Sequence, residues 1–134
     1  MFKILYSVVI MSLFGNPEPR IYVKNYFDSG KTKSEGWLKN NQKTDYWFYY
    51  YENGNKKEEG HYANNKKIKW WIFYDVNQEI EKKCMFENDK MNGFCIIYFK
   101  GKIIRGEKFK NGEKIKQWET VEQFKKDNPI SYLY

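Results

Sequence analysis

The two cysteines of this chain are the residues best placed for covalent chemistry, because Cys84 and Cys95 flank one predicted turn. If Asp89 and Lys90 form that turn, the cysteines lie directly opposite each other on adjacent strands. If Asn88 and Asp89 form it, the cysteines are diagonal neighbours, too far apart for easy bridging. An oxidising compartment would favour a Cys84–Cys95 disulfide. The alternative is two buried free thiols that pack as small apolar side chains.

The other reactive side chains form no catalytic or metal-binding pattern. His61 is the single histidine, and no set of Cys or carboxylate residues clusters around it in the sequence, so we expect it to pack on its neighbours in a sheet. Four carboxylates stand out in the middle of the chain: Glu58, Glu59, Glu79 and Glu81. Charges repeated along strands are typical of a solvent-facing surface. We predict no catalytic residue, no metal ligand and no cofactor, and we expect the chain not to be an enzyme.

Aromatic side chains beside lysines are the remaining candidates for a binding site. Aromatic residues make up 20% of the chain and charged residues 31%, so the two kinds must interleave. Tyr and Trp are favoured anchors of protein interfaces. The candidate partner-binding residues are Tyr46, Tyr49, Tyr51, Trp70, Lys67 and Lys69. The alternative role for these rings is to cover their counterparts in neighbouring units.

A period of 24 residues organises the elements that must position these side chains. Tyr26, Tyr50, Tyr74 and Tyr98 recur at this interval, and three further columns follow them. The columns are Leu38, Tyr62 and Phe86; Asn40, Asn64 and Asn88; and Trp47, Trp71 and Cys95. In the fourth unit, Phe109, Asn111 and Trp118 continue these columns at a spacing of 23. Such a period predicts supersecondary units that stack in a regular array.

Each unit has the pattern of a β-hairpin. Asn and Gly tolerate the positive φ of tight hairpin turns, and Asn111-Gly112 is the strongest such signal. A second set of turns joins one unit to the next, at Asp28-Ser29-Gly30, Glu52-Asn53-Gly54 and Lys100-Gly101. We therefore predict an all-β antiparallel meander of about four hairpin units. Its nine strands are expected to start near Ile21, Lys33, Thr44, Lys57, Ile68, Ile80, Gly93, Ile103 and Lys114.

The two ends of the chain differ from the repeats, which we assign to residues 16–118. Thr120 and Gln123 make a capping box, so Thr120–Asp127 is predicted to be a short helix that covers the last unit, within a C-terminal segment of residues 119–134. Residues 1–15 carry one early lysine and then an apolar run, which is the pattern of a secretory signal peptide and is too short to span a bilayer. The alternative for residues 1–15 is a strand buried against the first repeat.

The repeat region resembles MORN-repeat proteins, in the variant found in bacterial YwqK-type antitoxin-like proteins. The shared signature is visible in Tyr50–Gly54, Glu59–Tyr62, Asn64–Lys67 and Trp70-Trp71. The resemblance covers about Ile21 to Trp118. It implies an elongated array of β-hairpins that serves as an interaction surface and has no enzymatic activity of its own.

The third unit departs from this signature, because Lys83-Cys84 replaces Glu59-Gly60. A Gly beside a bulky aromatic residue lets the ring lie flat over the neighbouring strand. We therefore expect the third unit to pack differently around its two cysteines.

Charge and location complete the functional prediction. The net charge is +7, but most lysines alternate with acidic residues, which is typical of a solvated strand surface. We predict an exported protein, periplasmic or secreted, that binds a protein or cell-envelope partner through its sheet and has no small-molecule substrate. The alternatives are an intracellular antitoxin-like protein that neutralises a partner, and a basic protein that docks on nucleic acid or on the anionic lipid of a membrane. Export argues against nucleic acid.

Overall fold

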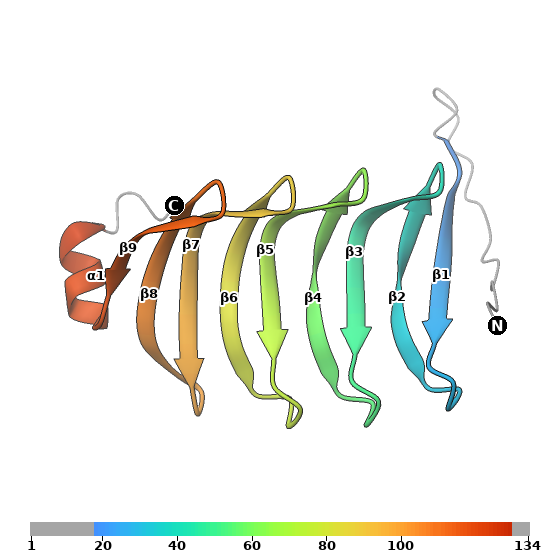
Figure 1. Ribbon diagram of the computed structural model, residues 1–134, viewed down its shortest axis with the longest axis horizontal. Coiled ribbons are helices and arrows are strands. Elements are labelled where there is room, and N and C mark those ends of the chain that lie inside the picture. Colours follow the sequence, from blue (N-terminus) through green and yellow to red (C-terminus); the bar gives the residue numbers. More distant parts are fainter. Residues whose placement is uncertain (1–17, 130–134) are drawn as a thin grey trace.

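One antiparallel sheet contains the whole repeat region. The computed structural model describes residues 18–129, which form nine strands and one helix (Figure 1). Spatial order follows chain order, so hairpins connect all the strands. The strands are β1 Arg20–Tyr26, β2 Thr32–Lys39, β3 Gln42–Tyr50, β4 Lys56–Ala63, β5 Lys66–Tyr74, β6 Ile80–Glu87, β7 Lys90–Phe99, β8 Lys102–Lys110 and β9 Glu113–Trp118. The predicted all-β meander is confirmed, and each strand starts at most three residues before its predicted position.

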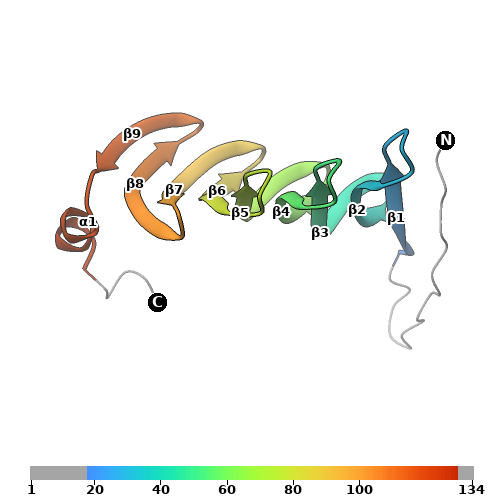
Figure 2. The ribbon, with the colours of Figure 1, turned by 90° about the horizontal axis from the view of Figure 1, so that it is seen from below.

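The sheet is an elongated array with two sets of turns on opposite edges (Figure 1), and its strands are visibly bent (Figure 2). The turns within units lie on one edge, and the turns between units on the other. Within each unit the two turn residues have positive φ, as in Asn64 and Asn65 with φ of 49° and 66°. These are the conformations of a two-residue hairpin turn whose twist matches the strands.

A ring laid over a glycine is the repeated packing contact of the sheet. Gly36 pairs with Trp47, and Gly60 pairs with Trp71. A Cβ at either glycine would lie 2.3 or 2.4 Å from a carbon of the paired indole, which is too close for any side chain. Trp47 and Trp71 are consequently 1% and 0% exposed. We call the face of the sheet that carries these two rings the tryptophan face.

A bulge in the second strand of each unit sets this register. Gly60 pairs with Trp71, but the next residue, His61, pairs with Ile68, so Lys69 and Trp70 are two extra residues on β5. Such a bulge bends the strand and increases its twist. The bulges explain why a ring seven residues after the first turn residue lies directly over the glycine of the preceding strand.

The equivalent bulge in β7 determines how the two cysteines pair. Asn88 and Asp89 form the turn, since both have positive φ. The diagonal arrangement expected from that turn is wrong, because β7 has two extra residues next to Gly93 and Cys84 therefore lies directly opposite Cys95. The pair occupies the position of a glycine and its ring in the third unit, where the structure links the two sulfur atoms by a disulfide.

The fourth unit presents its ring on the other face. Its bulge has only one extra residue, Ile115, and Trp118 lies opposite Gly106. Gly106 pairs with Ile96, the neighbour of Cys95 in the chain. Because side chains alternate along a strand, this shift of one residue places Trp118 on the opposite face from Cys95. Trp118 keeps the sequence spacing of the column that contains Trp47 and Trp71, but its side chain lies on the other face of the sheet.

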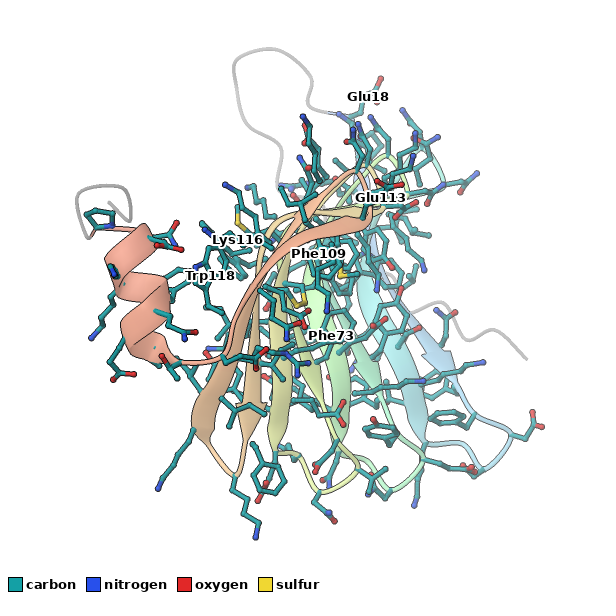
Figure 3. The ribbon with its side chains drawn as sticks, turned by 60° about the vertical axis from the view of Figure 1, so that its left-hand side comes forward. Glu18, Phe73, Phe109, Glu113, Lys116 and Trp118 are labelled. Atoms are coloured by element: carbon teal, nitrogen blue, oxygen red, sulfur yellow. A yellow bond between two sulfur atoms is a disulfide. The ribbon has the colours of Figure 1, made fainter. Side chains whose placement is uncertain are left out.

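The predicted C-terminal helix is confirmed as α1, Val121–Asp127. The hydroxyl of Thr120 accepts a hydrogen bond from the backbone N–H of Gln123 at 3.1 Å, as expected for an N-cap. Phe124 packs edge-on against Trp118, with ring centroids 5.2 Å apart, and Figure 3 shows Trp118 beside α1. The helix thus covers the ring of the last unit. The signal peptide predicted for residues 1–15 lies outside the described residues.

Replacement of Gly60 by Ala tests the ring-over-glycine contact. We expect Gly60→Ala to lower the free energy of unfolding by about 2 to 3 kcal/mol, because the new methyl group would displace the buried ring of Trp71. Gly106→Ala is the matched control, since its nearest neighbour would be Phe124 at 3.3 Å, and we expect a loss below about 1 kcal/mol. Denaturant unfolding measures both variants. Equal midpoints for Gly60→Ala and the unmodified chain would contradict the packing model.

Candidate interaction surfaces

The tryptophan face is occupied by the chain's own side chains. The ammonium nitrogen Nζ of Lys43 lies 4.9, 5.2 and 5.0 Å from the ring centroids of Trp47, Tyr49 and Tyr62. It also donates a hydrogen bond to Tyr49 Oη at 2.6 Å, and the hydroxyls of Tyr49 and Tyr62 are hydrogen-bonded at 2.9 Å. Burial and the bond to Tyr62 raise the pKa of the Tyr49 hydroxyl. Tyr49 therefore belongs to the interior of this face.

Lys67 has the same surroundings one unit further on. Its Nζ lies 4.0 Å from the ring centroid of Trp71 and 5.3 Å from that of Phe73. The same nitrogen donates to both carboxylate oxygens of Glu58, at 3.1 and 3.2 Å. The side chains of Lys67 and Glu58 are only 21% and 20% exposed. Lys67 is thus held by contacts within the sheet.

The opposite face carries a row of half-exposed rings and apolar side chains that crosses six strands. We call it the cross-strand row, and its members pair in register as Tyr22 with Trp37, Tyr46 with His61, and Trp70 with Met85. Five interstrand steps give the row a length of roughly 24 Å. Its most exposed ring is Trp70, at 41%.

Neighbouring rings of the cross-strand row pack against each other edge-on, and none carries a formal charge near neutral pH. Tyr22 packs edge-on against Trp37 with centroids 5.1 Å apart, and Tyr46 packs in the same way against His61 at 4.8 Å. Partial burial lowers the pKa of His61, and the positive charge of Lys69 lowers it further. The imidazole is therefore neutral near pH 7. The row presents a mostly aromatic surface with a single neutral imidazole in it.

The structure separates the six residues predicted to bind a partner. Tyr46 and Trp70 lie on the cross-strand row, and exposed Lys69 precedes Trp70 in the bulge of β5. Tyr49 and Lys67 lie on the tryptophan face. Tyr51 lies just after β3, where its hydroxyl donates to the carbonyl oxygen of Tyr74 at 2.8 Å, a contact between neighbouring units.

Four members of the cross-strand row were not among the predicted binding residues: Tyr22, Trp37, His61 and Met85. A sequence signal for three of them exists, because Trp37, His61 and Met85 recur at intervals of 24 residues. The period shows that they share a face, but only the register shows that Tyr46 and Trp70 lie beside them.

Within residues 18–129, no group of three or more His, Cys, Asp or Glu side chains could hold a metal ion. In the same range, no helix is both long and apolar enough to cross a membrane. Comparison with protein-family models, curated proteins and solved structures finds no match to the chain. The resemblance to MORN-repeat proteins therefore stays a prediction.

Replacement of Lys67 by Met tests whether this lysine is a structural residue. We expect Lys67→Met to lower the free energy of unfolding by about 1 to 2 kcal/mol, because it removes the contact with Trp71 and leaves Glu58 without its cation. Lys66→Met is the matched control, since Lys66 is exposed on the same strand. A variant as stable as Lys66→Met would show that the lysine contributes nothing to the sheet.

Alkylation tests the cysteine pair. We expect an iodoacetamide-treated, unreduced chain to keep its mass even when unfolded in denaturant, because Cys84 and Cys95 are linked. The same treatment after reduction should label both cysteines. Mass spectrometry reads the result, and labelling of both residues without reductant would show two free thiols.

Proposed function

We propose that this chain is a non-catalytic repeat protein that binds a protein partner through the cross-strand row. The observation that carries the proposal is the row itself, in which rings on five strands and Met85 on a sixth align on one face and Trp70 is 41% exposed. Tyr and Trp are enriched among residues that dominate binding energy at protein interfaces. The only helix of residues 18–129 packs at β8 and β9, away from the row.

The chemistry of the cross-strand row favours a protein over a nucleic acid. Single-stranded nucleic acid needs a positively charged groove that follows its backbone beside the stacking rings. The cations beside the row include Arg20, Lys24 and Lys69, and the first two are paired with Asp45 and Glu35. A row with so little free positive charge offers stacking surfaces but few contacts for phosphates.

Whether the partner lies inside or outside the cell depends on the N-terminal segment. If residues 1–15 direct export, the partner belongs to the cell envelope or the exterior. If the chain stays inside the cell, the same surface would serve an antitoxin-like role, in which binding neutralises the partner. Both versions use the same row of residues.

Exchange of the two most prominent aromatic residues tests the proposal. We expect the double variant Tyr46→Ser with Trp70→Ser to lose partner capture from an extract of the native host by about tenfold or more, because each ring removed costs a buried contact. Ile115→Ser is the matched control, as Ile115 is 55% exposed on β9, outside the row. Quantitative mass spectrometry compares the captured proteins.

Two outcomes would overturn the proposal. The first is equal capture by the double variant and the control. The second is salt-sensitive retention of the unmodified chain on an oligonucleotide column that the double variant loses, which would indicate nucleic acid.

A further inference from the structure

A second exposed surface lies at the hairpin that joins β7 to β8. Phe99, Ile103 and Ile104 are 61%, 44% and 46% exposed, and they flank the Lys100-Gly101 turn. Among the residues described, these three form the densest group of exposed large apolar side chains along the sequence. Large exposed apolar groups close together are a feature of interaction sites.

This hairpin differs from the other three turns on its edge of the sheet (Figure 1). Each of those turns contains an acidic residue: Asp28, Glu52 and Asp75. Each is also closed by a backbone hydrogen bond across a wider loop, such as Tyr51 N–H to the Asn55 carbonyl at 2.8 Å. The β7–β8 turn has two residues with φ of 47° and 73°, and no acidic residue occurs from Phe99 to Gly106.

An apolar crevice adjoins the hairpin, between α1 and strands β7 and β8. Its apolar lining consists of Phe94, Cys95, Ile96, Ile103, Gly106, Val121 and Phe124, and its polar residues are Glu107 and Thr120. Ile103 is common to the crevice and the exposed hairpin. A concave apolar site beside an exposed apolar group suits a side chain that inserts, whereas a bilayer would favour a protruding surface.

The C-terminal part of the chain, which supplies most of the crevice lining, carries most of the net positive charge of the described residues. Residues 99–129 contain nine Lys and Arg against five Asp and Glu, whereas residues 18–98 contain fourteen against twelve. Of those five acidic residues, Glu107 is paired with Arg105 and Asp127 with Lys116, at 2.9 and 2.7 Å. A ligand of complementary charge is therefore acidic.

We propose that the crevice and the β7–β8 hairpin bind an acidic segment of a partner protein. An apolar side chain of that segment enters the crevice beside Ile103, and its carboxylates meet Lys100 and Lys102, which are both exposed. This site shares no residue with the cross-strand row, so either proposal can fail without the other.

Fluorescence anisotropy with a defined probe tests this site on the full chain. The probe is a short fluorescein-labelled peptide of Asp and Glu around a central Leu-Phe pair. We expect salt-sensitive binding that Phe99→Ser with Ile104→Ser weakens by about tenfold or more, through lost apolar burial. The charge reversal Lys100→Glu with Lys102→Glu should abolish it. Phe99 and Ile104 do not line the crevice, so these variants should keep the native circular dichroism spectrum.

The controls separate this proposal from its rivals. Val76 is an apolar residue in another turn and is 53% exposed. The Val76→Ser variant should bind the probe as tightly as the unmodified chain. A peptide with Ser-Ser in place of Leu-Phe should bind at least about tenfold more weakly. No binding of the acidic probe, or equal binding by the hairpin variants, would overturn the proposal. So would retention on phosphatidylglycerol vesicles without peptide binding, which would indicate a lipid surface.

Discussion

The ring-over-glycine contact is the constraint on which this structure depends. A single-layer sheet has no second layer to cover its large side chains, so each ring must be buried by its own neighbours. Trp71 achieves this by lying on Gly60 while Tyr62 packs against its edge, with centroids 5.0 Å apart. Tyr62 makes a similar contact with Trp47 at 6.0 Å. Contacts between rings therefore run through the interior from one hairpin to the next.

The third and fourth units show how this contact can be replaced. In the third unit a Cys84–Cys95 pair stands where a glycine and an indole would be, so two small side chains fill the space of one large one. In the fourth unit a shorter bulge moves Trp118 to the other face, where Phe124 covers it. The change of face lets a short helix close the array, because a repeat needs a cover at its end.

Packing on the tryptophan face decides which side chains remain available to a partner. Lys43 and Lys67 bring positive charge close to buried rings, and this face satisfies them with hydroxyl and carboxylate partners. Its aromatic groups are consequently part of the core. On the cross-strand row and at the β7–β8 hairpin, Trp70, Phe99, Ile103 and Ile104 stay at least 41% exposed. The two proposed interaction sites lie where the packing of the repeats leaves rings and lysines exposed.

Local signals in the sequence determined the strands, the turns and the C-terminal helix. Turn residues such as Asn64-Asn65 and the cap at Thr120 act through adjacent atoms, so their effect can be predicted without knowing the partners of the strand. The face of each side chain could not be predicted in this way. Bulge residues such as Lys69 and Trp70 have no distinctive type, and only the pairing of whole strands shows that they are extra. Two extra residues in β7 bring Cys84 opposite Cys95, whereas the single extra residue in β9 places Trp118 on the other face.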